Sequence, residues 1–279
     1  MPELPEVETV CRGLERVLAG RRMVHVAVHR PDLRVPFPAG FAAALTGRRV
    51  EVVRRRAKYY QWLLDDGQAV VGHLGMSGTF EVSPPGSNRP PPGKHDHVVI
   101  ETEEGAIVTF RDPRRFGLMT LVPQAELETH PLLADIGPEP LDDAFDGAAL
   151  VAGLAGRRGP VKPALLDQKV VAGIGNIYAS EALFRARISP RRGCDSITGV
   201  RAARLVAALK EVLREAIASG GSSLRDHRLV NGELGYFQHA FAVYDREGEP
   251  CPGCDCDRRA VQRIVQGGRS TFFCAHKQR

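Results

Sequence analysis

Apolar side chains recur at the spacing of a helix over the first eighteen residues. Val7, Val10, Leu14 and Leu18 follow one another at intervals of three or four positions, so they share one helical face. The prolines at positions 2 and 5 are compatible with a helix because they stand at its start, where a missing N–H group costs nothing. The pattern predicts an amphipathic helix over residues 3–18.

Between residues 24 and 122 the apolar runs shorten to the length of strands. Turn signals such as Asp65-Asp66-Gly67 separate the runs, which is typical of a β-sandwich. A stretch rich in proline and glycine over residues 83–93 predicts a mobile surface loop. The predicted strands cover residues 24–28, 50–53, 59–64, 69–72, 97–102, 106–110 and 118–122.

Beyond residue 131 the periodicity becomes helical. Helices are predicted over residues 148–156, 163–171, 177–185 and 200–218. No element is predicted from residue 220 to 236, and loops of that length in compact proteins are usually functional or disordered. We expect an α+β fold with domains over residues 1–131, 148–237 and 238–279, and a linker over residues 132–147.

The composition is that of a globular protein. Hydrophobic residues make up 43% of the 279 positions and charged residues 25%, which excludes wholesale disorder. No apolar stretch approaches the length that spans a bilayer, and the acidic, proline-broken start is unlike a signal peptide. We therefore expect a cytoplasmic protein without a membrane partner.

Positive charge is concentrated near the C-terminus. The net charge is +5, and residues 251–279 supply +4 of it through six basic and two acidic residues. A basic module on a near-neutral body is typical of a surface that contacts phosphates, although a solubilising tail has the same composition.

Four of the six cysteines lie in this basic module, and their spacing predicts zinc. Cys251 and Cys254 are separated by two residues, which suits adjacent corners of a zinc tetrahedron, and Cys274 follows. A second matching pair would place a cysteine at position 277, where the chain has lysine. The fourth ligand is therefore His276, Cys256 or none, and a hairpin without metal is the alternative.

A glycine-rich turn, residues 172–178, superficially resembles a dinucleotide-binding loop. Tyr178 occupies the position of the third glycine and helices are predicted on both sides, so no nucleotide cofactor is expected. A turn that opens a helix at Asn176 presents free backbone amides to a phosphate, but an ordinary helix cap has the same sequence.

Two glycine-flanked turns of the predicted sandwich carry apolar residues beside arginine. Met76 lies in one turn, and Arg114 and Phe116 lie in the other. Apolar side chains at loop tips are typical of wedges that part base steps in DNA, while arginine replaces a lost hydrogen-bonding partner. For each apolar residue taken singly, core packing is the ordinary interpretation.

The N-terminal segment combines an amine with carboxylates. Removal of Met1 would expose the secondary amine of Pro2 beside Glu3 and Glu6, and such an amine can form a Schiff base. Acidic residues in a first helical turn also simply suit the helix dipole.

Taken together and in this order, these segments resemble the bacterial formamidopyrimidine-DNA glycosylase family, bifunctional enzymes that excise oxidised purines. The resemblance covers nearly the whole chain. It rests on residues 2–9, 56–59, the turns around His73 and Asp112, and residues 137–140, 166–168, 173–181, 235–238, 248–251 and 268–274. The family fold implies a β-sandwich with an N-terminal helix, then a helix-two-turn-helix domain and a β-hairpin zinc finger.

The resemblance also implies roles for individual residues. Pro2 would be the nucleophile, Glu3 the general acid and base, and Glu6 a supporting carboxylate. Residues 222–236 would form the loop that closes over a flipped lesion. Phosphate-gripping and other DNA contacts would come from Lys58, His73, Lys162, Asn176, Ser222, Tyr236 and Arg269, and void filling from Met76, Arg114 and Phe116, with Lys58 and Arg269 counted among the catalytic residues.

We therefore expect a monomeric glycosylase and lyase that acts on damaged double-stranded DNA in the bacterial nucleoid. Lys277 departs from the family pattern at the fourth zinc ligand, and the hairpin before Cys274 is longer than usual. One alternative is a relative similar to endonuclease VIII that prefers oxidised pyrimidines. Another is a non-catalytic DNA-binding protein, against which the intact Pro2, Glu3 and Glu6 argue.

Overall fold

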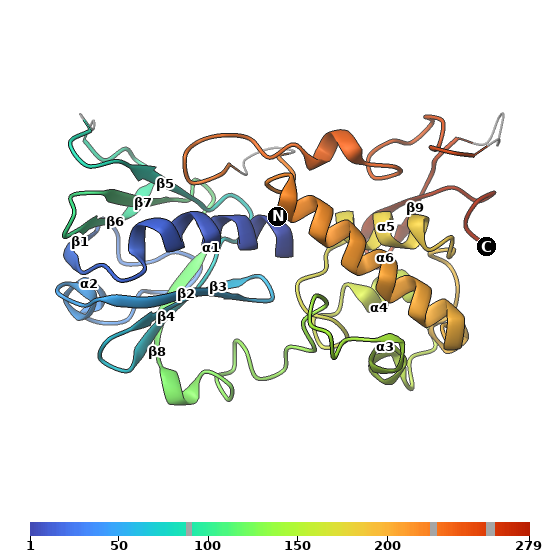
Figure 1. Ribbon diagram of the computed structural model, residues 1–279, viewed down its shortest axis with the longest axis horizontal. Coiled ribbons are helices and arrows are strands. Elements are labelled where there is room, and N and C mark those ends of the chain that lie inside the picture. Colours follow the sequence, from blue (N-terminus) through green and yellow to red (C-terminus); the bar gives the residue numbers. More distant parts are fainter. Residues whose placement is uncertain (88–90, 224–227, 255–259) are drawn as a thin grey trace. The chain divides into compact units, whose positions relative to one another are not determined.

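The computed structural model of the chain describes residues 1–87, 91–223, 228–254 and 260–279 (Figure 1). These residues form two compact units. The N-terminal unit comprises Met1–Ala134 and Ser219–Gln238, and the C-terminal unit comprises Asp135–Ala218 and His239–Arg279. Residues 219–238, which the sequence analysis grouped with the helices, thus pack with the sandwich. The chain leaves the first unit, builds the second and then returns.

Two four-stranded antiparallel sheets build the N-terminal unit. The strands are β1 (Met23–Val28), β2 (Val50–Arg56), β3 (Tyr59–Leu64), β4 (Gln68–His73), β5 (Thr79–Ser83), β6 (Asp96–Thr102), β7 (Ile107–Arg111) and β8 (Leu118–Pro123). The strand orders in the two sheets are β1-β6-β7-β5 and β2-β3-β4-β8. Strand β1 pairs with β6, so three strands of the other sheet lie between these two in sequence.

Helix α1 (Leu4–Leu18) completes the core of the sandwich, and the short α2 (Phe41–Leu45) and η1 (Gln124–Glu126) lie in connections. The predicted apolar face of α1 is fully buried, because Val7, Val10, Leu14 and Leu18 have no exposed surface. These side chains share one hydrophobic cluster with residues of both sheets. The amphipathic helix predicted from the sequence is therefore confirmed.

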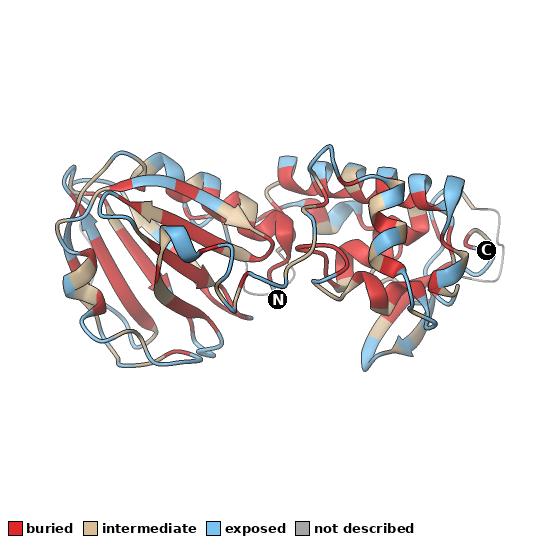
Figure 2. Cartoon of the chain, turned by 90° about the horizontal axis from the view of Figure 1, so that it is seen from below, coloured by how far each residue is buried: buried red, intermediate tan, exposed pale blue. Residues whose placement is uncertain are grey.

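Aromatic rings fill the centre of this core, where Figure 2 shows continuous buried stretches along the strands. The ring of Phe80 lies 5.2 Å from that of Tyr60, 5.7 Å from that of Trp62 and 5.0 Å from that of Phe110, measured between centroids. Edge-on and tilted arrangements of this kind are favourable because the ring edge meets the ring face. The cluster joins strands of both sheets.

The C-terminal unit is built from helices and one hairpin. Its helices are α3 (Gly147–Leu154), α4 (Val161–Leu165), α5 (Asn176–Arg185) and α6 (Gly199–Ala218), with short η2 (Cys194–Ser196), and η3 (Phe237–Ala240) follows where the chain returns to this unit. The hairpin pairs β9 (Gln262–Gln266) with β10 (Arg269–Phe273). Among the helices that the structure describes, none combines the length and the apolar character needed to cross a membrane.

The α+β fold and the seven predicted strands are confirmed, whereas strand β5 and helix α2 were not predicted. Strand β5 has only Phe80 and Val82 as alternating apolar residues, next to glycine and proline. Helix α2 is one short turn in which Phe41 and Leu45 are buried. Two alternating apolar residues give too weak a pattern to reveal β5, and a single turn gives too weak a pattern to reveal α2, so tertiary packing supplies their stability.

The helix predicted over residues 163–171 is wrong beyond Leu165. The side-chain amide of Gln168 donates to the carbonyl oxygens of Leu166 and Ile174, at 3.1 and 2.9 Å, and its oxygen accepts from the N–H of Gly173. These bonds satisfy backbone groups in a turn. Side chains that offer the backbone such partners compete with the helix, and here they end it.

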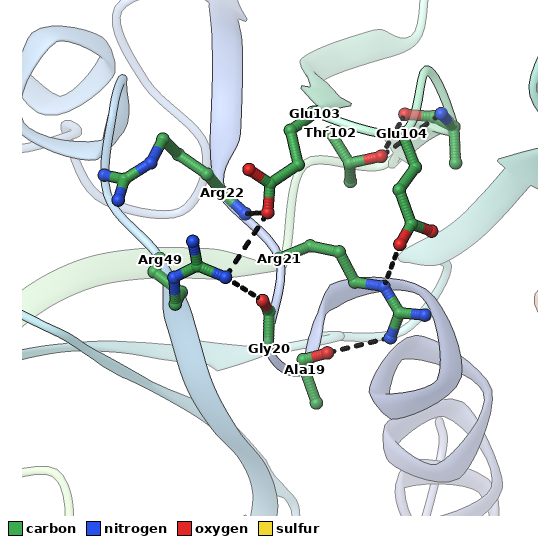
Figure 3. A network of polar contacts seen from close by, with 9 residues as sticks. Ala19, Gly20, Arg21, Arg22, Arg49, Thr102, Glu103 and Glu104 are labelled. Atoms are coloured by element: carbon green, nitrogen blue, oxygen red, sulfur yellow. Dashed lines mark hydrogen bonds and ion pairs between the residues drawn. The ribbon is translucent and has the colours of Figure 1, made fainter.

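An ion-pair network closes one end of the sandwich (Figure 3). Arg21 pairs with Glu104 at 3.2 Å and Arg49 with Glu103 at 3.4 Å, while Glu103 also accepts from the backbone N–H of Arg22 at 3.0 Å. The network links the turn after α1, the residue that precedes strand β2 and the turn between β6 and β7. These arginines are engaged by carboxylates, so the network belongs to the fold.

Two polar atoms in the aromatic core have no hydrogen-bonding partner among the described residues. They are the hydroxyl oxygen of Tyr60 and the indole nitrogen of Trp62, both in side chains with no exposed surface. Tyr60 lies against Gly72, where a Cβ atom would overlap its ring. Burial of the phenol raises the pKa of Tyr60 well above its ordinary value.

Replacement of Tyr60 by phenylalanine should leave the free energy of unfolding unchanged or raise it by up to about 1 kcal/mol. The change removes a buried hydroxyl without a partner and opens almost no cavity. Urea denaturation followed by the fluorescence of Trp62, the one tryptophan of the sequence, measures the difference.

Gly72→Ala is the control, and it should cost about 2 kcal/mol or more because the new methyl group overlaps the ring of Tyr60. A Tyr60→Phe protein that is clearly less stable than the wild type would contradict the first expectation.

Candidate functional site

The N-terminal turn of α1 holds the predicted nucleophile and carboxylates together. Pro2 is buried, and Glu3 and Glu6 are 3% and 2% exposed. Oxygen Oε2 of Glu6 accepts a hydrogen bond of 2.8 Å from the backbone N–H of Glu3. The Glu6 side chain thereby fixes the backbone that follows Pro2.

The other oxygen of Glu6 reaches a segment more than 200 residues away in sequence. Oε1 accepts a hydrogen bond of 2.8 Å from the backbone N–H of Ser222. Gly221 has a φ of +79°, and a Cβ atom there would lie 3.1 Å from Oε1 of Glu6. Glycine at this position therefore allows the returning chain to approach the carboxylate closely.

The returning segment, residues 219–238, is closed at its base. Ser222 pairs with Tyr236 in an isolated bridge, and the N–H of Ser223 donates to the side-chain oxygen of Gln238 at 2.9 Å. Ser222 is buried, whereas Tyr236 is 66% exposed. The side chain of Val230 packs into the space above Gly13 of α1. Residues 224–227 of this segment lie outside the described part of the chain.

Lys58 and His73 come from neighbouring strand ends of one sheet. Lys58 follows Ala57, whose φ of 52° forms the tight turn between β2 and β3, and Lys58 is 6% exposed. His73 pairs across the sheet with Tyr59, and its Nδ1 accepts a hydrogen bond of 2.8 Å from the N–H of Gly75. Burial, aided by the positive charges of Lys58 and Arg34, lowers the pKa of His73 to about 4. His73 is therefore neutral at pH 7.

Met76, Arg114 and Phe116 lie on two loops, residues 74–78 and 112–117, which we call the wedge loops. Met76 is 38% exposed and Phe116 is 46% exposed, so core packing does not explain either side chain. The guanidinium carbon of Arg114 lies 4.9 Å from the centre of the Phe116 ring. The predicted set is thus available at the surface of the N-terminal unit.

In the C-terminal unit, a buried lysine joins the helices to the hairpin. Lys162 has no exposed surface, and its ammonium group donates to the side-chain oxygens of Asn176 and Thr271 and to the carbonyl of Ser270. The amide of Asn176 also donates to Ser270, at 2.9 Å. Arg269, which precedes Ser270 at the start of β10, is exposed. Lys162 thus links helix α5, which carries Asn176, to strand β10, which carries Arg269.

Glu181 on α5 is a residue that sequence reasoning missed. It has no exposed surface and accepts hydrogen bonds of 2.8, 3.0 and 2.8 Å from the backbone N–H groups of Ala242, Val243 and Tyr244. Burial raises the pKa of this carboxyl, and the three backbone bonds oppose the rise. A second missed residue is Asp112 of the wedge loops, which is also fully buried.

The predicted cysteines meet beside the hairpin. The sulfurs of Cys251, Cys254 and Cys274 all lie within 4.8 Å of one another, and those of Cys254 and Cys274 are 3.7 Å apart. Sulfurs about 2.3 Å from a tetrahedral zinc are separated by about 3.8 Å, so the donor set fits this ion. The three cysteines could hold zinc.

Of the two candidates for the fourth zinc ligand, His276 lies beside the cysteine cluster. Nδ1 of His276 lies 3.4 Å from the sulfur of Cys254, while Cys256 is outside the described residues. The ammonium group of Lys277 donates to the carbonyl of Pro252 at 3.0 Å and lies 4.5 Å from the centre of the Phe184 ring. Lys277, which stands where the family pattern has the fourth cysteine, thus contacts Pro252 and Phe184.

Comparison with known proteins identifies the family of this chain. A family model described as the formamidopyrimidine-DNA glycosylase N-terminal domain matches residues 1–119, and the H2TH domain model of the same enzymes matches residues 136–228. The formamidopyrimidine-DNA glycosylase of Rhodospirillum rubrum is 59% identical over 282 residues, which cover 100% of both chains.

Two solved structures share the fold over nearly the whole chain. The MutM (Fpg) protein of Thermus thermophilus is 42% identical with a TM-score of 0.85, and the match covers 99% of this chain and 98% of that one. The Fpg of Lactococcus lactis in complex with DNA containing an abasic site is 32% identical with a TM-score of 0.88, over 99% of each chain. The chain belongs to the formamidopyrimidine-DNA glycosylase family.

Proposed function

We propose that this DNA glycosylase excises oxidised purines, such as 8-oxoguanine and formamidopyrimidines, from duplex DNA and then cleaves the strand as an abasic-site lyase. The observation that carries the proposal is the buried N-terminal turn. In this turn Pro2 directly precedes Glu3, and the side chain of Glu6 fixes the backbone N–H of Glu3. Relatives from Lactococcus lactis have been solved with DNA containing a formamidopyrimidine lesion or an abasic site, which supports the same substrate class here.

The proposed chemistry starts from the free amine of Pro2 after removal of Met1. The unprotonated form of this secondary amine can attack the anomeric carbon of the damaged nucleotide. The bond to the base breaks, and the sugar opens to an iminium ion on the Pro2 nitrogen. Glu3 donates and accepts the protons at the sugar.

The iminium ion makes strand cleavage accessible. Its positive charge acidifies the neighbouring carbon of the sugar, so a proton leaves and the 3′ phosphate is eliminated, followed by the 5′ phosphate. Water then releases Pro2 from the sugar fragment. A nitrogen that forms a cationic adduct is therefore suited to both glycosylase and lyase steps.

Base excision also requires that the nucleotide leave the helix, because its reacting atoms are unreachable inside a duplex. We assign void filling to Met76, Arg114 and Phe116, which are available on the wedge loops. Arg114 would face the orphaned base, and Ser222 and Tyr236 would contact the flipped nucleotide.

Phosphate contacts are assigned to both units. Lys58 and His73 would contribute from the N-terminal unit, His73 as a neutral hydrogen-bond donor through Nε2. Asn176 and Arg269 would contribute from the C-terminal unit, where Lys162 binds the elements that carry them. Zinc on the three cysteines would stiffen the hairpin that carries Arg269. The partner is damaged double-stranded DNA, bound by a monomer in the bacterial cytoplasm at the nucleoid.

Retention of Met1 should abolish covalent trapping, because it converts the amine of Pro2 into an amide. Protein that keeps Met1, verified by mass spectrometry, and processed wild type are each treated with borohydride in the presence of a duplex containing 8-oxoguanine. A second duplex with an oxidised pyrimidine tests the alternative lesion class.

Glu3→Gln is the matched control because it keeps the amine. It should slow base excision by about 100-fold or more, the usual contribution of a general acid, and still be trapped on a preformed abasic site. Trapping of the Met1-retaining protein at the wild-type rate would show that Pro2 is not the nucleophile.

The lowered pKa of His73 should make the protein less stable as pH falls from about 6.5 to about 4. In this window the unfolded chain binds a proton at His73 that the folded chain does not, so folding loses about 1.4 kcal/mol per pH unit from this group. Between pH 7 and pH 5, we expect wild type to lose about 2 kcal/mol more than His73→Asn. Urea denaturation at both pH values measures the difference.

His25→Asn, at an exposed position of β1, controls for the loss of an imidazole and should follow the wild type. If the free energy of unfolding fell equally with pH in wild type and in His73→Asn, the interpretation of His73 as buried and neutral would be wrong.

Arg269→Ala should weaken binding to any duplex and lower the slope of log affinity against log salt concentration by about one unit, as expected for one lost phosphate contact. Arg263→Ala is the matched control on the same hairpin. The Arg263 guanidinium is engaged with Ser270 at 3.0 Å, so its loss should leave the slope unchanged.

Chelation of the metal should reduce the thermal stability of the hairpin more than its affinity for DNA. The hairpin is also held by Lys162 and by a hydrophobic cluster that includes Phe184, Val261 and Phe272. Stoichiometric zinc whose removal abolishes DNA binding would instead make the metal a requirement for binding.

A further inference from the structure

The two wedge loops meet at one buried carboxylate. Asp112 has no exposed surface. Its Oδ1 accepts a hydrogen bond of 2.6 Å from the hydroxyl of Ser77 in the first loop, and its Oδ2 accepts one of 2.7 Å from the N–H of Gly117 at the end of the second. A single side chain therefore connects the segment that carries Met76 with the segment that carries Phe116.

The hydroxyl of Ser77 extends this connection to Arg114. It donates its proton to Asp112 and accepts a hydrogen bond of 3.2 Å from the backbone N–H of Arg114. Ser77 is itself 4% exposed, so water competes weakly for these bonds. The residue next to Met76 thus fixes the backbone of Arg114.

Asp112 is in turn fixed to the sheet that supports the loops. Its N–H donates to the carbonyl of His95 at 3.1 Å, and its carbonyl accepts from Nε2 of His97 at 2.8 Å. The carbonyl also accepts from the N–H of Arg115 at 3.2 Å. The carboxylate therefore has a defined position from which to hold both loops.

The loop backbones are also in direct contact. Gly75 has a φ of +65°, and a Cβ atom there would overlap the backbone of Phe116. A Cβ at Gly117 would lie 3.0 Å from Oδ2 of Asp112. Neither loop can change its conformation while these contacts and the hydrogen bonds to Asp112 persist.

We propose that Asp112 and Ser77 are positioning residues that hold Met76, Arg114 and Phe116 in one arrangement before DNA binds. The inference rests on the proposed void-filling role of these three side chains. Exposed apolar side chains on free loops would lose conformational freedom when they enter a duplex, and a fixed loop pair avoids most of that cost. The hydrogen bonds to the carboxyl group of Asp112 are short, at 2.6 and 2.7 Å, and they lie in a site from which water is excluded.

The test compares binding to two duplexes of the same sequence, one with a tetrahydrofuran abasic analogue and one undamaged. The affinity ratio between them measures void filling and needs no base excision. Asp112→Asn keeps the shape of the side chain but replaces one acceptor oxygen by a donor. It should lower the ratio about tenfold or more, the effect expected from the loss of one charge-assisted hydrogen bond.

Ser77→Ala removes the link to Asp112 and Arg114 and should lower the ratio similarly. Ser77→Thr retains the hydroxyl and should preserve the ratio. In the double variant the two losses should not add, because both act on one connection. If Asp112→Asn does not fold, the two Ser77 variants carry the test.

Thr102→Val is the matched control. Thr102 is buried at the opposite end of β6 and bonds to Ala106 across the turn to β7 through its hydroxyl. This change should lower the melting temperature without altering the affinity ratio. A ratio that falls equally in Thr102→Val would show that general destabilisation, rather than positioning, explains the effect.

Borohydride trapping on single-stranded DNA with a preformed abasic site separates positioning from catalysis. A single strand leaves no void, so Asp112→Asn and Ser77→Ala should be trapped at the wild-type rate. Equal loss on single-stranded and duplex DNA, or an unchanged duplex ratio in both folded variants, would overturn the proposal. A wild type that binds the analogue duplex selectively but excises no oxidised purine would instead refute the proposed function.

Discussion

The carboxylate of Glu6 is the interaction on which the N-terminal turn depends. One of its oxygens binds the N–H of Glu3 and the other binds the N–H of Ser222. The first bond sets the backbone next to Pro2, and the second brings the returning segment to the same place. An exchange of this side chain for one without two acceptor oxygens would remove both hydrogen bonds at once, since each is made to a backbone amide.

The same physical device recurs at three other places in the described chain. Asp112 binds both wedge loops, Glu181 binds three successive amides ahead of the hairpin, and Lys162 binds acceptors on α5 and β10. A buried charge is costly unless it is fully compensated, and each of these side chains is compensated by groups from distant parts of the sequence. A few buried ionisable side chains thus hold segments together that are well separated in the sequence.

The sequence predicted what depends on local pattern. The face of α1, seven of the strands and three of the four long helical segments follow from the periodicity of apolar residues. The spacing of the cysteines and the amine of Pro2 beside two carboxylates singled out these residues, and the family motifs predicted roles for them. Asp112 and Glu181 were missed because their partners are mostly backbone N–H groups and a hydroxyl, which leave no mark in a single sequence. The end of α4 at Leu165 was missed for a related reason, since the side chain of Gln168 replaces the helical bonds.

The return of residues 219–238 to the sandwich has a consequence for the order in which the protein is made. During synthesis, residues 1–134 leave the ribosome well before Ser222 and Val230 exist, and at 5–20 residues per second the interval is on the order of ten seconds. Until then the space above Gly13 is unfilled, and Glu6 lacks the amide of Ser222. The N-terminal turn of α1 therefore gains its contacts with the returning segment only after residues 135–218 have been translated, so a chain that stops within those residues lacks part of the packing around Pro2, Glu3 and Glu6.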